Sequence, residues 1–407
     1  MKLASLIPSH PNSTSLGTGL ALGASILLAA CGSAATPAPT APAASASTAA
    51  TSSSVPASAR PSADAGSASK PAASASTAAA ASAGASAAAQ AKPAAPVPLT
   101  LYAATGYDDA MAKAFQTATG IPVNLVADST GPLLAKIQAE KNNPQWSMVW
   151  IDGAEAIAAL DQQGMLLRGY TPNVDWSAQG KSLLPKNQSY FPMHVTVVGV
   201  LFYDSKNLSS PPATWQDLLK PEWKNMVGMN NPSISGPTYP FVAGVMDQMG
   251  GEDQGKAYFK QLKSNGLQVF NKNKDTLHAM DIGQIKMSAV QSSAGYAILD
   301  KNPTLKAVYP SKVVLLPNVM AIDGKAPAQV QAEAKQFAEF ALSPKGQQIA
   351  ADEARDGDSW HWPVLNGGKA LPGMPDINSI PAAAVDPYVW GPKEDEINQW
   401  FTDNIVP

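Results

Sequence analysis

The chain has 407 residues, of which 28 are Lys or Arg and 31 are Asp or Glu, so its formal net charge is −3. This length predicts two to three domains. The slightly acidic balance gives no indication of a nucleic-acid-binding surface. The single cysteine, Cys31, excludes an intrachain disulfide and any CxxC metal or redox site.

The first 31 residues have the features of a targeting segment. Lys2 and His10 precede an apolar run over 20–30, which is too short and too interrupted by glycine for a membrane span. The run ends Leu-Ala-Ala-Cys-Gly, which resembles the bacterial lipobox, in which the cysteine becomes the acylated first residue of the mature protein. We therefore predict a lipoprotein signal peptide over 1–31, lipidated at Cys31. The alternative is an ordinary signal peptide with a chance cysteine.

Residues 32–96 are predicted to be a disordered linker. Between Ser33 and Pro96 nearly every residue is Ala, Ser, Pro or Thr, and Val55 is the only large aliphatic one. Such a segment cannot bury enough apolar surface to offset the entropy lost on ordering. The globular body begins near Val97 and carries all nine Trp and all ten Tyr.

Strands and helices alternate in the first part of the body. Apolar runs predict three strands, over 99–103, 121–127 and 147–151. Each is followed by a helical pattern, over 108–118, over 132–140 and up to Gly164. This order predicts a parallel sheet with helices on its faces. Ligands of such sheets bind at the carboxyl ends of the strands, which here are 104–107, 128–131 and 152–153.

A second α/β unit follows. A long apolar strand is predicted over 195–203, and a turn with a capped helix over 211–219. A polar loop over 230–239 then enters a helix that runs through Met249. Further predicted elements are strands over 286–290 and 313–316, the latter leading back to the first unit, and helices over 327–341, 344–354 and 394–405.

Several stretches carry a family resemblance. The most specific are ATWQDLLKPEWK at 213–224 and FALSPKGQQIA at 340–350. Together with the order of the elements over about 99–365, they resemble the extracellular solute-binding proteins of ABC importers, type 2 class, in the branch that includes ferric-ion and phosphonate binders.

The resemblance implies a type 2 periplasmic-binding-protein fold of the α/β class. This fold has two lobes, each a sheet flanked by helices, and crossover strands that form the hinge. We assign 97–197 with 312–407 to lobe 1 and 198–311 to lobe 2. The resemblance also implies a monomer without enzymatic activity or cofactor, which binds a small-molecule solute between the lobes and delivers it to an importer permease. The lipid anchor and flexible linker would place the body at the cell envelope, on the periplasmic or extracellular side.

Two polar loops lead into helices in a way that suits an anion. Ser129 and Thr130 put hydroxyl donors beside helix-start amides that have no intrahelical acceptor and lie at the positive end of the helix dipole. Gly131 would let a ligand approach the backbone closely. The residues that repeat this chemistry are Ser233, Ser235, Gly236 and Thr238, with Ser292 and Ser293 as a third cluster. The alternative is that each hydroxyl only caps its own helix.

This pattern predicts a phosphonate or phosphate ester, such as an aminoalkylphosphonate, as the solute. Asp152 or Asp128, or an aromatic side chain, would receive the ammonium group. For Asp152 the alternative is again a helix cap. The complete set of predicted ligand-binding residues is Thr105, Tyr107, Ser129, Thr130, Gly131, Asp152, Ser233, Ser235, Gly236, Thr238, Tyr239, Ser292, Ser293 and Tyr296.

Ferric iron is the alternative solute. Iron binders of this family typically use two adjacent tyrosines, whereas the corresponding stretch 291–296 has only Tyr296, and no adjacent pair occurs in the chain. The tyrosines that remain as possible iron ligands are Tyr102, Tyr107, Tyr239 and Tyr296.

An enzyme on a related two-lobed scaffold is the alternative function class. The body contains no Walker A loop, no GxSxG and no cysteine. Its histidines are His194, His278 and His361, and their spacing fits neither HxxxH nor HExxH, so we predict no metal site. We expect His194 to have a structural role near the hinge.

Overall fold

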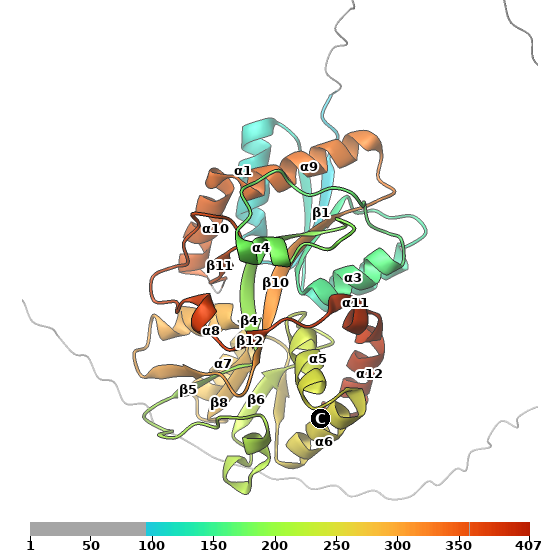
Figure 1. The fold of residues 1–407 in the computed structure, drawn as a ribbon. Coiled ribbons are helices and arrows are strands. Elements are labelled where there is room, and N and C mark those ends of the chain that lie inside the picture. Colours follow the sequence, from blue (N-terminus) through green and yellow to red (C-terminus); the bar gives the residue numbers. More distant parts are fainter. Residues whose placement is uncertain (1–94, 358) are drawn as a thin grey trace, which may run out of the picture. The chain divides into compact units, whose positions relative to one another are not determined.

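Two separate β-sheets, each covered by helices, form the body of the protein (Figure 1). The structure is a computed structural model that describes residues 95–357 and 359–407. The predicted signal peptide with Cys31, and the predicted linker up to residue 94, lie outside the described residues. None of the helices in the described ranges has both the length and the apolar character needed to cross a membrane.

The first sheet has seven strands in the order β11-β4-β10-β3-β1-β2, with β12 paired to β10. The strands are β1 (Leu99–Ala103), β2 (Val123–Ala127), β3 (Met148–Asp152), β4 (Phe191–Val198), β10 (Val313–Ile322), β11 (Trp362–Pro363) and β12 (Ala382–Ala383). The predicted parallel pairing is confirmed for β1 with β2 and with β3. The sheet as a whole is mixed, because β10 runs antiparallel to both β3 and β4.

The second sheet has five strands in the order β7-β6-β8-β5-β9. They are β5 (Val200–Asp204), β6 (Val227–Asn230), β7 (Gln268–Phe270), β8 (Met287–Val290) and β9 (Leu305–Val308). Here β6 is parallel to β7 and β8, while β5 is antiparallel to its neighbours β8 and β9.

Helices cover both faces of each sheet. Those associated with the first sheet are α1 (Asp108–Thr119), α2 (Thr130–Ala139), α3 (Ala154–Gln162), α4 (Ala178–Ser182), α9 (Ala328–Leu342) and α10 (Pro344–Asp356). Those associated with the second sheet are α5 (Thr238–Gln248), α6 (Glu252–Ser264), α7 (Asn273–Asp281) and α8 (Ser292–Leu299). The chain closes with α11 (Pro387–Trp390), the short 3₁₀ turn η4 (Gly391–Lys393) and α12 (Glu394–Asn404).

Alternating side chains of the strands fill the layers on the two sides of the first sheet. Trp150 packs with Phe115 of α1 and Phe337 of α9, whose rings meet edge to face at 5.0 Å. Its neighbour Ile151 packs in a different cluster with Ile137 of α2. Successive strand residues therefore serve opposite faces, as the pleat of a strand requires. A sheet covered on both faces holds the loops at the ends of its strands in place, and the candidate site lies at these strand ends.

The predicted single strand over 195–203 is wrong. Gly199 has a φ of 84°, and the chain there leaves β4 of the first sheet and enters β5 of the second. An added Cβ at Gly199 would approach the Phe241 ring to 2.9 Å, so both the backbone angle and the packing favour glycine. The apolar pattern gave no sign of the break, because the residues on both sides of it are buried.

The capped helix predicted to follow a turn within 211–219 is shorter than expected. Only a 3₁₀ turn forms, at Gln216–Leu219. Pro221 follows two residues later and disfavours helical backbone at the residue before it, so the turn cannot extend. The buried Trp215 anchors this segment in the core of the second sheet.

The C-terminal helix lies with the second sheet. Phe401 and Ile405 pack into a cluster with Phe259 of α6 and Met229 of β6. We predicted that 312–407 would belong entirely to lobe 1, and we now propose that residues 394–405 belong to lobe 2.

Candidate functional site

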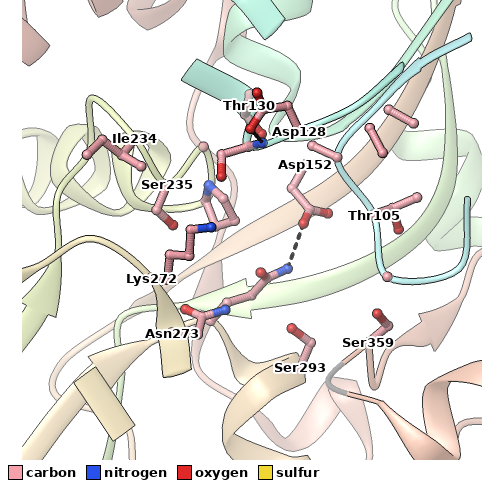
Figure 2. Close-up of a pocket in the computed structure, with 18 of the residues that line it drawn as sticks. Thr105, Asp128, Thr130, Asp152, Ile234, Ser235, Lys272, Asn273, Ser293 and Ser359 are labelled. Carbon is pink, nitrogen blue, oxygen red and sulfur yellow. Dashed lines mark hydrogen bonds between the residues drawn. The ribbon is translucent and has the colours of Figure 1, made fainter. Parts of the chain in front are cut away.

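A cavity of about 580 Å³ opens where strand ends of the two sheets face each other (Figure 2). One wall is formed by the residues that follow β1, β2 and β3, and the other by those that follow β6, β7 and β8. Figure 2 shows Asp128, Thr130 and Asp152 on the first wall, and Lys272, Asn273 and Ser293 on the second. The location is the one expected for ligands of α/β sheets.

Five helices begin at this cavity. Residues at or beside the first turns of α1, α2, α5, α7 and α8 all line it. The first N–H groups of a helix have no intrahelical acceptor, and the helix dipole adds partial positive charge there. The first turns of these helices contain three carboxylates, Asp108 and Asp109 in α1 and Asp275 in α7, of which Asp108 lines the cavity, and burial raises the pKa of Asp108. The convergence favours a negatively charged ligand group.

Half of the predicted site residues line the cavity. They are Thr105, Ser129, Thr130, Asp152, Ser235, Gly236 and Ser293. Ser129 is the N-cap residue of α2, and its side chain makes no capping hydrogen bond. The structure therefore does not use the Ser129 hydroxyl in the way that the capping alternative required.

The other predicted hydroxyls lie outside the cavity lining and bond within the protein. The Ser292 hydroxyl accepts from the Val197 N–H at 3.0 Å. The hydroxyl of Tyr239 donates to the Trp390 carbonyl at 2.5 Å. The remaining pairs are Ser233 with Thr402, Tyr296 with Tyr309, and Tyr107 with His194. Thr238 also lies outside the cavity lining and is buried in the first turn of α5. These residues serve the fold, because a buried polar group needs a partner.

Gly131 permits a contact other than the predicted one. An added Cβ there would overlap the Ser233 carbonyl. At Gly236 it would overlap the Thr130 side chain. The start of α2 and the loop before α5 therefore touch directly beside the cavity, and glycine is present at both contact positions. Gly131 brings the Ser233 backbone, rather than a ligand, close to the start of α2.

Asp152 is held by amide groups from both sheets. The side-chain amide of Asn318, on β10, donates to its Oδ1 at 2.9 Å. That of Gln291, the N-cap residue of α8, donates to Oδ2 at 3.1 Å, the bond drawn dashed in Figure 2. The same Gln291 amide also donates to Thr196 Oγ1 at 3.1 Å. The helix-cap alternative does not apply, because the N-cap residue of α3 is Gly153. The carboxylate instead bridges the two sides of the cavity.

His194 also lines the cavity, near Asp152, and its imidazole is neutral. Burial, followed by the nearby His361, lowers the pKa of His194 well below its usual value. Burial, followed by the charge of Asp152, raises the pKa of Tyr107, so the phenol keeps its proton. The Tyr107 hydroxyl is hydrogen-bonded to Nδ1 of His194 at 2.7 Å, and Nε2 of the imidazole lies 3.9 Å from Asp152 Oδ1. We expected a structural role for His194 near the hinge, and the structure places this residue in the lining of the cavity.

The lysines of the site were missing from the sequence prediction. Lys272 and Lys274 line the cavity at the start of α7, together with Asn271 and Asn273. They follow β7, a strand of only three residues, which is too short to show an alternating pattern. The polar run Asn-Lys-Asn-Lys-Asp ahead of a helix was the available signal.

Comparison with known proteins gives the family. The model of the bacterial extracellular solute-binding protein family matches residues 110–358. The chain belongs to this family. It is therefore a solute-binding protein of a transport family rather than a member of an enzyme family, and the resemblance seen in the sequence is confirmed.

Individual relatives of this solute-binding protein are distant. A candidate 2-aminoethylphosphonate-binding periplasmic protein of Salmonella paratyphi A is 24% identical over 313 residues, which cover 74% of this chain and 88% of the relative. The periplasmic binding protein AfuA of Actinobacillus pleuropneumoniae, solved with fructose-6-phosphate, superposes with a TM-score of 0.66 at 20% identity over 76% of this chain and 98% of its own. Iron-bound HitA of Pseudomonas aeruginosa gives 0.62 at 21% identity over 76% and 99%. These structures confirm the two-lobed fold.

The contact between Thr130 and Gly236 generates a prediction about closure. Gly236→Ala should disfavour this arrangement by about 1–3 kcal/mol, because the added methyl overlaps the Thr130 side chain. That energy shifts a two-state equilibrium roughly 5- to 150-fold. Small-angle scattering should show a larger radius of gyration than for the unchanged protein.

Thr130→Gly in the same chain provides the matched rescue. It removes the side chain that the new methyl would meet, so the double variant should return toward the original radius, whereas Thr130→Gly alone should not expand the protein. An unchanged radius in Gly236→Ala would show that this contact does not limit closure.

Proposed function

We propose that the protein captures a small anionic solute in this cavity and delivers it to the permease of an ABC importer. The solute is a phosphonate or phosphate ester, such as an aminoalkylphosphonate. The observation that carries the proposal is the convergence of five helix starts on one cavity that also contains lysines and carboxylates.

The anionic end of the solute would lie against the helix starts. Ser129 and Thr130 on one wall and Ser235 and Ser293 on the other supply hydroxyl donors within the same cavity. Lys272 adds positive charge from the second wall (Figure 2). Hydrogen bonds to charged oxygens are stronger than those between neutral groups, which suits a phosphonate with three acceptor oxygens.

The cationic end would lie near Asp152 and Asp128. Both line the cavity, and Asp152 is fixed in place by Asn318 and Gln291. A cavity that contains both hydrogen-bond donors and carboxylates suits a zwitterion. The Salmonella relative, which is named for binding 2-aminoethylphosphonate, supports the same solute class.

Iron is the second candidate, because HitA has the same fold and binds it. The four tyrosines that would carry iron do not line the cavity. Tyr102 bonds to Glu140, and the other three bond to His194, Trp390 and Tyr309. The geometry therefore favours the anion.

The hydroxyls beside α2 have a quantitative consequence. In calorimetric titrations with 2-aminoethylphosphonate, the double variant Ser129→Ala/Thr130→Ala should bind about 1–3 kcal/mol more weakly, because two donors to a charged oxygen are lost. Ser233→Ala is the matched control: its hydroxyl bonds to Thr402 and Asn398 outside the cavity lining, so affinity should not change. Equal affinities in all three proteins would refute the assignment. A visible charge-transfer band with ferric citrate would support iron.

Asp152 should distinguish solutes that carry an amine. Asp152→Asn should weaken 2-aminoethylphosphonate by about 1.5–3 kcal/mol, since a charged partner of the ammonium is removed. Ethylphosphonate, which has no amine, corrects for any disturbance of the Asn318 and Gln291 hydrogen bonds. A loss that is the same for both solutes would show that Asp152 supports the cavity but does not recognise the amine.

We also propose that Cys31 carries a lipid that tethers the protein to the membrane at the cell envelope. This proposal rests on the sequence pattern around Cys31. Cys31→Ala should move the protein from the membrane fraction to the soluble fraction and abolish incorporation of labelled palmitate. If the variant fractionates and labels like the unchanged protein, the lipobox assignment is wrong.

A further inference from the structure

A second cluster of titratable groups lies where α3 meets the C-terminal segment. An added Cβ at Gly391 would overlap the backbone carbonyl of Glu155, so η4 packs directly on the first turn of α3. Beside it, Gly153 lies against Pro240 of α5, with an added Cβ 3.1 Å from the proline Cγ. The hydroxyl of Tyr239, also on α5, holds the Trp390 carbonyl. Helices associated with both sheets therefore join at this point.

Two carboxyl groups are buried in this junction. Glu155, in the first turn of α3, is 3% exposed, and Glu394, in the first turn of α12, is 8% exposed. Among the described residues, the Oε2 atom of Glu155 has no hydrogen-bond partner. A buried carboxylate without a partner is costly, whereas a protonated carboxyl avoids most of that cost.

The nearby cations are directed to other carboxylates. Lys393 Nζ lies 3.3 Å from Glu252 Oε2 and over the ring of Trp390. Lys256 Nζ lies 2.5 Å from Glu252 Oε1 and 3.5 Å from Glu396. The other titratable groups that face the pair or share its surroundings are Tyr190, Tyr239, Tyr388, Asp386 and Asp395, with Lys186 exposed at the cavity that Glu155 lines. The titratable groups that lie closest add negative charge or none.

We propose that Glu155 and Glu394 form a proton-dependent latch, which fastens α12 and η4 to α3 when the carboxyls are protonated and loosens when they ionise. The latch joins α3 of the first sheet to α12, which packs on the second. A cavity of about 440 Å³ lined by Glu155 provides a route for protons between the junction and solvent.

The raised pKa values of the two glutamates in the folded protein decide how stability changes with pH. Burial raises the pKa of Glu155 to about 7. Burial, followed by the charge of Glu155, raises the pKa of Glu394 well above its ordinary value. Because the folded protein holds these protons more tightly than the unfolded chain, their stabilisation is complete below the ordinary glutamate pKa of 4.5 and is lost as the pH rises through about 7.

Thermal unfolding of the full chain between pH 5 and pH 8.5 tests the latch. The melting temperature of the unchanged protein should fall relative to Glu155→Gln and Glu394→Gln as the pH passes about 7. Each variant should be more stable than the unchanged protein at pH 8.5, by about 3–6 °C. Glu353→Gln, which removes an exposed charge on α10, is the control and should follow the unchanged protein.

A second measurement separates a latch from a purely local effect. Hydrogen exchange over residues 387–404, corrected for intrinsic rates, should show less protection at pH 8.5 than at pH 6 in the unchanged protein, and a smaller difference between the two pH values in each variant. Two results would overturn the proposal: melting curves of both variants that run parallel to those of the unchanged protein, or protection of α12 that does not depend on pH. If one variant does not fold, the other still decides the question.

Discussion

Residues at the starts of five helices line a common cavity, and this arrangement is the constraint on which the site depends. The first N–H groups of a helix have no intrahelical acceptor, so they need water, another group of the protein or a ligand. The two sheets bring the helix starts together because each sheet presents strand ends, and thus helix beginnings, to the same space. The chemistry of the cavity is therefore largely a property of the backbone, and the side chains adjust it.

Contacts between the two walls of the cavity set its dimensions. Gly131 and Gly236 allow the α2 start and the loop before α5 to meet, while Gln291 reaches Asp152 from the second wall. On another side of the same strand end, Gly153 lies against Pro240, and Glu155 meets the C-terminal segment. Residues 152–155 thus contribute to two junctions, one that holds the proposed solute and one that holds the proposed proton-dependent latch. Asp152 and Glu155 are separated by only two residues, so the two junctions share one short chain segment.

The sequence predicted the fold well and the site in part. Apolar runs located β1, β2 and β3, and residue patterns predicted a second α/β unit, while the family resemblance led us to divide the lobes at 197/198. The apolar pattern itself did not show that the strand is broken at Gly199. Ser292 and Ser293 illustrate the limit for the site. They are adjacent hydroxyls at one helix start, yet Ser292 bonds to the Val197 backbone and Ser293 lines the cavity. That difference depends on the direction of each side chain about the helix axis, which residue type alone does not specify. Lys272 was missed for a related reason, because its strand is too short to be recognised.

Native mass spectrometry of the protein as purified from its own cells tests most directly whether an anion binds at the helix starts. We predict a non-covalent adduct that is released on denaturation and has the mass of a phosphonate or phosphate ester, and elemental analysis should find phosphorus in proportion to it. An adduct with the mass of iron, or a retained organic solute that carries no anionic group, would contradict the proposed role of the convergent helix starts.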